Sequence, residues 1–394
     1  MQALRFSRSL SALAVASAVV WAGGARAADL LVLPDGGGPY PTIQSAVDAA
    51  DTGDSVVLGT GTFVGAGNRD ILVDGKQITL RSESGDPASS VIDCEGTAME
   101  PHRGLCIRGG EFMARGISIR NGDVSGAEPG RSNGGGILIE DVERVTLEVC
   151  IVESCTAFDG GGVYVRGLDR SVVILTDCEF RQNVATGIGG GVACVFGSLE
   201  ISNSLVLGNE GGDGGGVVIS SADGSIDSSV FVRNRSHNYG GAVIVDTGRL
   251  SIERSTLVEN RADNEYGAAV FSGALSEIGS ESQLRMQSSL VAFNGDGVAI
   301  GCDGQSSAQL TCCILYGNGS DELDGCVGGV EEGTIHEDPL PCTSEDEDWS
   351  VHANSPCLPD NNGCGVQIGA SGAGCPASPV LRSSWGGIKS LFRD

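Results

Sequence analysis

The stretch Gly134-Gly135-Gly136-Ile137 decides the fold, because the chain repeats it at a nearly constant interval. Three close copies and two altered ones follow, at 160–163, 189–192, 214–217, 240–243 and 267–270. The third residues of the six copies are 26, 29, 25, 26 and 27 residues apart. A fixed period in the twenties is typical of a solenoid, in which every repeat forms one coil.

A second phrase lies between the glycine copies and keeps a register of its own. Its copies end at Cys155, Asn183, Asn209, Asn234, Asn260, Asn294 and Asn318. The residue eight positions earlier is always large and apolar, from Leu147 to Leu310, and so is the residue three positions earlier, from Val152 to Leu315. The residue five positions earlier is always Cys or Ser. The residue type is constant at three positions in all seven copies. This constancy indicates that the three positions form inward-facing columns of a repeated coil.

Inside each copy the apolar pattern has a period of two, as in Val163-Tyr164-Val165. Alternation with β-branched residues predicts strands, and no repeat shows the 3.6-residue period of a helix. We therefore predict an all-β fold, a single right-handed parallel β-helix with three strands per coil. The recurrent Asn is expected to stack as a ladder at a turn, where its side chain can bond the neighbouring backbone.

These phrases resemble the right-handed parallel β-helix repeat proteins of the pectin-lyase-like superfamily, especially its secreted bacterial members. They are also similar to the repeats of polymorphic outer-membrane proteins, and the resemblance covers about residues 38–376. The segment from Pro41 to Val47, followed by Gly53-Asp54-Ser55-Val56-Val57, resembles the start of such proteins. The family implies that a helix near 42–50 plugs the open end of the core. Ser355-Pro356-Cys357 and Ile368-Gly369-Ala370 resemble the closing segment.

The chain divides into four parts. Residues 1–27 are expected to be a signal peptide, with a basic start at Arg5 and Arg8, an apolar run and an Ala25-Arg26-Ala27 cleavage site. The β-helix occupies 28–340, a Cys-rich C-terminal cap 341–376, and a flexible tail 377–394. In the tail, Trp385 to Arg393 is either a frayed end or a sorting signal. No stretch is apolar for long enough to span a bilayer.

The acidic composition limits the partners. The formal net charge is −27, and it becomes −30 when the three arginines of the signal peptide are removed. Such a surface repels nucleic acid. The acids either keep a repetitive monomer soluble or bind divalent cations or cationic partners.

The 14 cysteines lie after residue 27, which in an exported chain suggests disulfides. Cys150, Cys178 and Cys313 occupy the small inward column and are expected to be core residues. Cys94 with Cys106, and the group Cys342, Cys357, Cys364 and Cys375, are expected to form bridges. Without a C-x-x-C pair, structural zinc is not expected.

The catalytic phrases of the polygalacturonase-like members, Asn-Thr-Asp, Gly-His-Gly and Arg-x-Lys, do not occur in this sequence. The best carboxylate candidates are Asp159 and Asp213, which directly precede glycine triplets, and Asp263, a few residues upstream of its copy. Asp159 and Asp213 should lie two coils apart, about 10 Å, slightly more than an inverting acid/base pair requires. The same three aspartates are candidates for weak Ca²⁺ binding, the only cofactor considered.

Two functions remain open on the sequence. The first is a secreted or cell-surface scaffold or adhesion module without catalysis, which contacts an extracellular polysaccharide or a cell-surface component. The second is a carbohydrate-active enzyme, a polysaccharide lyase or glycoside hydrolase, that acts on an acidic polysaccharide through Asp159 and Asp213.

Overall fold

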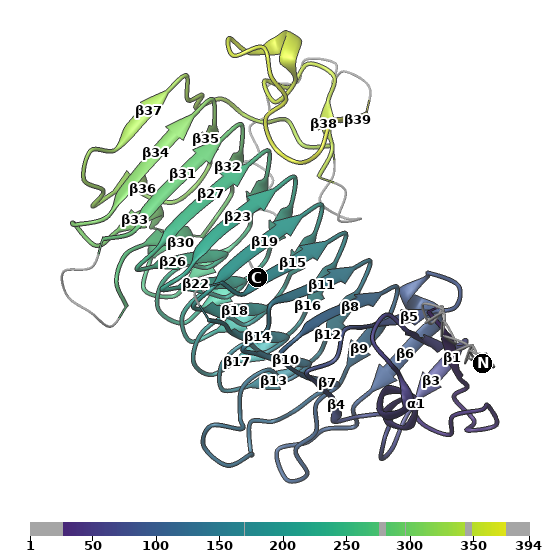
Figure 1. Cartoon of the computed structure of the whole chain (residues 1–394). Helices are drawn as coiled ribbons and strands as arrows, with labels where there is room; N and C mark the ends of the chain where they lie inside the picture. Colours follow the sequence, from purple (N-terminus) through teal and green to yellow (C-terminus); the bar gives the residue numbers. More distant parts are fainter. Residues whose placement is uncertain (1–26, 169, 276–280, 296, 343–348, 376–394) are drawn as a thin grey trace, which may run out of the picture.

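A computed structural model describes residues 27–168, 170–275, 281–295, 297–342 and 349–375. They form a right-handed parallel β-helix, as the sequence predicted. Figure 1 shows its strands stacked from the N-terminal helix to the last coils near β37. Each coil runs through a strand after the glycines, two further strands and, in the central coils, a short two-residue strand that was not predicted.

Sheet I holds the strands that follow the glycine turns. Its ten strands are β4 Ile71–Asp74, β7 Leu105–Arg108, β10 Ile137–Glu140, β14 Val163–Arg166, β18 Val192–Val195, β22 Val217–Ser220, β26 Val243–Asp246, β30 Tyr266–Ser272, β33 Val298–Cys302 and β36 Asp321–Asp324.

Sheet II comes next in each coil and is the longest. Its twelve strands are β1 Asp29–Val32, β2 Ser55–Leu58, β5 Ile78–Ser82, β8 Glu111–Arg115, β11 Arg144–Glu148, β15 Val172–Thr176, β19 Ser198–Ser202, β23 Asp223–Asp227, β27 Arg249–Glu253, β31 Gln283–Gln287, β34 Ser307–Thr311 and β37 Val330–Glu332.

Sheet III follows sheet II and precedes the Asn turn. Its ten strands are β3 Gly61–Phe63, β6 Ser90–Asp93, β9 Ser118–Arg120, β12 Ile151–Glu153, β16 Glu179–Arg181, β20 Leu205–Leu207, β24 Val230–Val232, β28 Thr256–Val258, β32 Leu290–Ala292 and β35 Ile314–Tyr316. The short sheet IV contains β13 Thr156–Ala157, β17 Val184–Ala185, β21 Glu210–Gly211, β25 Arg235–Ser236 and β29 Arg261–Ala262.

The predicted inward columns form the core. Leu147, Leu175 and Ile201 lie in register on neighbouring strands of sheet II, and all three are buried. The column continues through Ile226, Ile252, Met286 and Leu310. Because every coil places the same kind of side chain at the same height, the core is one continuous cluster from Leu30 to Leu315.

The predicted Asn ladder is present. Each Asn accepts, at Oδ1, hydrogen bonds from the backbone N–H and the Nδ2 of the Asn one coil earlier, as Asn234 does from Asn209 at 3.1 and 3.0 Å. Its own Nδ2 donates to a carbonyl of the previous coil, Val206 for Asn234. Cys155 begins the ladder by donating its N–H to Asn183. Buried amides are thereby satisfied inside the turn.

The N-terminal helix closes the core, as expected. Helix α1 Ile43–Ala49 begins after Thr42, whose side chain accepts from the Ser45 N–H in a capping box. Its buried face is Ile43, Ala46 and Val47, which belong to the main core cluster. Lys76 donates to the last carbonyls of the helix, those of Val47, Asp48 and Ala50. A cation there complements the helix dipole.

The C-terminal segment differs from the predicted cap, because it lies along the side of the solenoid rather than over its end. Trp349, Val351, Cys357 and Ile368 pack against Val232, Val258, Leu290 and Ile314, which are residues of sheet III. In Figure 1 this yellow segment, with β38 Val351–His352 and β39 Ala373–Cys375, stands beside the last coils. The short 3₁₀ helices are η1 Pro87–Ser89 and η2 Pro359–Asn361.

The disulfides correct the cysteine assignments in part. The bridges are Cys302–Cys326, Cys312–Cys364 and Cys342–Cys375. Cys94, Cys106 and Cys357, expected in bridges, are free thiols. Cys150, Cys178 and Cys313 are buried free thiols in the inward column, as predicted. Cys94 and Cys357 are buried in hydrophobic clusters, where they pack like the apolar residues around them.

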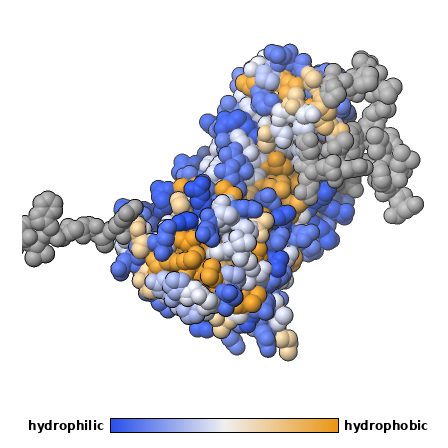
Figure 2. Space-filling model, turned by 90° about the vertical axis from the view of Figure 1, so that its right-hand side faces the viewer, coloured by the Kyte–Doolittle hydropathy of each residue, from blue (hydrophilic) through white to orange (hydrophobic). Residues whose placement is uncertain are grey.

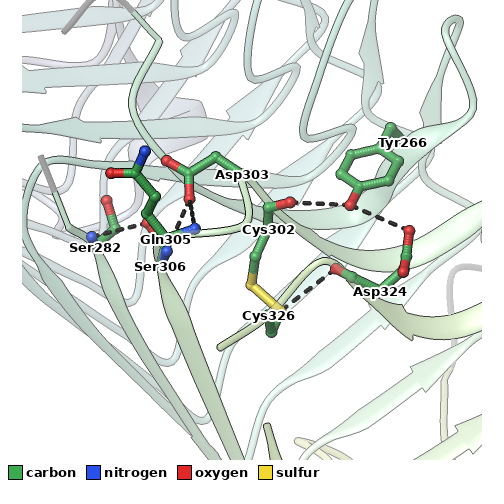
Figure 3. Close-up of a disulfide and its surroundings, with 8 residues drawn as sticks. All are labelled: Tyr266, Ser282, Cys302, Asp303, Gln305, Ser306, Asp324 and Cys326. Atoms are coloured by element: carbon green, nitrogen blue, oxygen red, sulfur yellow. Dashed lines mark hydrogen bonds between the residues drawn. A yellow bond between two sulfur atoms is a disulfide. The ribbon is translucent and has the colours of Figure 1, made fainter. Parts of the chain in front are cut away.

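The Cys302–Cys326 bridge ties the end of β33 to the turn after β36 (Figure 3). Beside it, Tyr266 Oη donates to the Cys302 carbonyl at 2.9 Å and contacts Asp324 at 3.3 Å. Asp303 accepts at Oδ1 from the N–H groups of Gln305 and Ser306 in the next turn. Covalent and polar contacts therefore hold the last coils, where few further coils cover the core.

Most of the surface in Figure 2 is hydrophilic, in keeping with the acidic composition. Within the described part of the chain, no helix has the length and apolar character that a membrane crossing requires. Residues 1–26 of the expected signal peptide and the tail after residue 376 lie outside the described residues.

Candidate functional site

Asp159 and Asp213 lie in one row on the turns that lead into sheet I. The glycine after each aspartate takes a left-handed backbone conformation, with φ of 60° at Gly160 and 65° at Gly214. Ile188 occupies the same place in the coil between them and pairs directly with Asp213. The backbone positions of Asp159 and Asp213 are thus two strand spacings apart, about 10 Å.

Asp213 carries an unsatisfied buried oxygen. Its Oδ1 is fully buried and has no hydrogen-bond partner among the described residues. Burial raises the pKa of the Asp213 carboxyl, and the N–H of Tyr239 and the side chain of Asn238 oppose this shift only in part. A buried carboxyl of raised pKa retains its proton to higher pH, which is the state that a general acid requires.

Asp159 is better satisfied than Asp213. Its Oδ1 accepts the backbone N–H of Ile188 in the next coil at 3.0 Å. Burial still raises the pKa of the Asp159 carboxyl, and the Ile188 N–H opposes the shift. This contact gives Asp159 a structural role, because it orders the turn that holds Ile188 between the two acids.

The aromatic residues around the glycine turns mostly pack on each other. Tyr239 stacks on Phe271 with ring centroids 4.8 Å apart, and Tyr266 meets Phe271 edge-on at 6.1 Å. Tyr164 and Phe271 are buried on the outer face of sheet I, where Phe271 contacts Leu275 of the insertion. Phe158, beside Asp159, and Tyr239 are the more exposed aromatic residues at these turns, at 53% and 37%.

Asp263 does not join the other two aspartates. It lies in a network of charges on the outer side of sheet IV, where its carboxylate accepts from Arg235 at 2.7 Å and from Arg261 at 3.2 Å. His237 bridges Asp263 and Glu210, at 3.3 and 2.9 Å. Arg235 lowers the pKa of the Asp263 carboxyl. The carboxylate is therefore already neutralised by cations of the chain.

The three aspartates do not converge on a metal. Within the described ranges, no group of three or more His, Cys, Asp or Glu side chains is arranged to hold a metal ion. Ca²⁺ takes six to eight oxygen ligands, and an isolated Asp159 or Asp213 supplies two oxygens at most. Ca²⁺ binding by these aspartates stays a prediction, and in the described residues their carboxylates are not gathered into one cluster.

A groove lies on a different face, the outer side of sheet II near the C-terminal end. It consists of two hollows of about 400 and 570 Å³ that share Asp223, Arg249 and Gln283. The larger hollow crosses four successive strands, β23, β27, β31 and β34, and the smaller one lies at the turns between sheets I and II. We call the two together the sheet II groove.

The groove is lined by polar side chains because outward positions of a half-buried strand alternate with the core. Its amides and hydroxyls are Gln283, Gln287, Gln309, Ser251 and Ser307. Arg249 is paired through Nε with Asp223 Oδ1 at 3.2 Å. Arg285 is exposed and donates to Gln309 at 3.4 Å, and no carboxylate among the described residues pairs with it.

The sequence reasoning missed this groove. Its residues are ordinary polar positions of the strand alternation, and no motif marks them. The only signal was the insertion after Ser272, which lengthens one coil and brings Glu281 and Gln283 to the groove.

The comparisons with known proteins identify the fold. A family model described as "Right handed beta helix region" matches residues 75–231. The solved structure of the pectate lyase Pel9A is similar with a TM-score of 0.55 at 12% identity, and the match covers 88% of this chain and 96% of that one.

Two other solved structures, pectin methylesterases from Aspergillus niger and from carrot, have TM-scores of 0.37 and 0.36 at 14% identity. Their matches cover 81% and 85% of this chain, and 93% of each of theirs. No curated protein matches the sequence. The family model and the pectate lyase structure together support the right-handed parallel β-helix fold.

Proposed function

We propose that this protein is a carbohydrate-active protein that acts on a carboxylate-bearing polysaccharide bound in the sheet II groove. The observation that carries the proposal is the groove itself, which is open and crosses four strands. An extended polymer with many hydroxyl groups can exchange hydrogen bonds with Gln283, Gln287 and Gln309 along this path.

Arg285 supplies the contact for a carboxylate on the polymer. Its guanidinium is exposed, contacts only the neutral Gln309 oxygen in the described structure, and has a planar fork that suits a carboxylate. Arg249 is less suited, because Asp223 already occupies it. The likeness to a pectate lyase structure supports a polysaccharide as the ligand class, since that protein has the same fold.

A second candidate places hydrolysis at Asp159 and Asp213. The observation in its favour is the raised pKa and unpartnered oxygen of Asp213, which suit a proton donor to a glycosidic oxygen. Asp159 would then be the base that activates water. Neither hollow of the sheet II groove includes these two residues in its lining, and the groove is our preferred ligand site.

The experiment measures binding and turnover on the same panel of acidic and neutral polysaccharides. The wild type is compared with Arg285→Gln, with Asp213→Asn and with the control Arg144→Gln, an exposed arginine on sheet II outside the groove. We expect Arg285→Gln to weaken binding of acidic polymers by about tenfold and to leave neutral ones unchanged, since a charged hydrogen bond is lost.

The other outcomes decide between the alternatives. Turnover that disappears only in Asp213→Asn would assign the reaction to the aspartate row. Binding without turnover in every variant would make the protein a non-catalytic adhesion module. No binding to any polysaccharide would refute the proposal for the groove.

We also propose that the chain is exported and cleaved after Ala27. In support, the N–H of Ala28 donates to Asp54 Oδ1 at 2.7 Å, and Ser55 N–H donates to the Ala28 carbonyl. A new terminal ammonium at Ala28 would meet the Asp54 carboxylate directly. N-terminal sequencing of the exported protein tests this, and a start other than Ala28 would exclude it.

A further inference from the structure

Phe196 stands out among the residues at the turns between sheets I and II. The register of sheet I aligns Val195 with Ser220 and Asp246, so that Phe196, Ser221 and Thr247 occupy the same position in three successive coils. All three have a left-handed backbone, with φ of 63°, 49° and 55°. The turn requires this conformation, which is uncommon for small polar residues and strained for a bulky one.

Phe196 is a bulky apolar residue where its equivalents in the next two coils are small and polar. Its exposure is 47%, and within the described residues its ring stacks on no other aromatic ring. Phe293 also has a positive φ, but its ring meets Tyr316 edge-on and lies against the C-terminal segment. Phe196 therefore combines a left-handed backbone with an apolar side chain that is about half exposed to water.

The position of Phe196 suggests that a ligand compensates for its left-handed backbone and its exposed ring. Ser221 and Thr247, its equivalents in the next two coils, line the smaller hollow of the sheet II groove, as does Gly197, the residue after Phe196. Phe196 therefore directly precedes, in sequence, a residue that lines the end of the groove. Leu168, one coil earlier and 58% exposed, lies near this turn, because its carbonyl oxygen is 3.2 Å from where a Cβ on Gly197 would stand.

Strain held at the rim of a binding site is a recognised mark of function. An aromatic ring offers a flat apolar surface, and a sugar ring has a flat face of C–H groups that can cover it. We propose that Phe196 is the stacking platform for one sugar unit of the polysaccharide, at the end of the groove beyond Arg249 and Asp223. This inference rests on the proposed function.

The test compares Phe196→Ser with Phe196→Tyr. Serine occupies this position in the next coil, at Ser221, so the substitution is compatible with the turn and should give a thermal midpoint equal to or above that of the wild type. Tyrosine keeps the ring. Leu168→Ser is the control for loss of an exposed apolar side chain near the same turn.

The readout is affinity for a series of oligosaccharides of increasing length. We expect the wild type and Phe196→Tyr to gain about fivefold in affinity at the length that first reaches the platform. Phe196→Ser should lack this step and otherwise follow the wild type, and Leu168→Ser should keep it.

Arg285→Gln, measured in parallel, separates the two ideas. A fall in affinity at every length for Arg285→Gln, with an unchanged length profile for Phe196→Ser, would overturn the platform and leave the proposed function standing. If the wild type bound no oligosaccharide, both the stacking platform at Phe196 and the proposed function of the groove would be refuted.

Discussion

Asn318 donates a hydrogen bond from Nδ2 to Glu322 Oε2 at 2.7 Å, and this contact ends the Asn ladder. Asn318 has no further Asn above it, so that its amide requires another acceptor. Glu322 supplies the oxygen from the start of the next coil. The cost is a partly buried carboxyl, and burial raises its pKa.

Glu322→Gln should stabilise the last coils at neutral pH, because an amide oxygen still accepts from Asn318 and no buried charge remains. A raised folded-state pKa means that stability falls as pH rises through the titration of Glu322. The gain should therefore vanish at acid pH. Thermal unfolding at several pH values measures it, with Glu322→Ala as the matched variant that loses the acceptor and is destabilised.

Asn234→Ala should destabilise the solenoid by about 2–4 kcal/mol, since it leaves several buried donors and acceptors without partners. Asn234 makes four hydrogen bonds inside the turn, two as acceptor and two as donor. Denaturant unfolding gives the free energy of unfolding. Asn264→Ala, an exposed position with one backbone contact, should change it little, and equal effects of the two variants would contradict the ladder's importance.

Asp213→Asn should raise stability at pH 7 by about 1 kcal/mol, because it removes the cost of ionising a buried carboxyl with an unpartnered oxygen. The pKa of Asp213 is raised on folding. The wild type therefore loses stability as pH rises above the ordinary Asp range near 4, whereas the variant does not. Coincident pH profiles for the two proteins would show that Asp213 is well solvated.

Removal of the Cys312–Cys364 bridge, as a double Ser variant, should release the C-terminal segment without unfolding the central coils. The bridge spans 52 residues and joins the end of sheet II to that segment. Limited proteolysis should become faster after residue 335, whereas the thermal midpoint of the coils changes less. The Cys302–Cys326 double variant, within the last coils, is the control and should not expose the segment.

Much of the fold could be predicted because every coil of a parallel β-helix repeats the same arrangement of strands, turns and inward-facing side chains. Leu147, Leu175 and Ile201 occupy equivalent positions, and each copy of the phrase strengthens the assignment of the others. The Asn ladder and helix α1 could also be predicted. The turns need hydrogen-bond partners for their backbone, and the open end of the core needs a cover.

Features that occur once could not be predicted in this way. The path of the C-terminal segment depends on contacts between Trp349 or Ile368 and sheet III, which are far apart in sequence. Disulfide partners depend on the same path, so that Cys312–Cys364 was missed. At the candidate site, the spacing of Asp159 and Asp213 followed from the repeat, but the partners of Asp263 and the groove around Arg285 required the side chains in space.

The Asn ladder has a consequence for the history of the chain. Because Asn234 bonds only to residues of the coils next to it, a duplicated coil would find every partner it needs, and a deleted one would leave none behind. Gene duplication can therefore lengthen or shorten the molecule in steps of one coil, about 4.8 Å. One shorter insertion lies in the coil between Asn260 and Asn294, which are 34 positions apart. The length of the groove is thus an evolutionary variable that can change without a new fold.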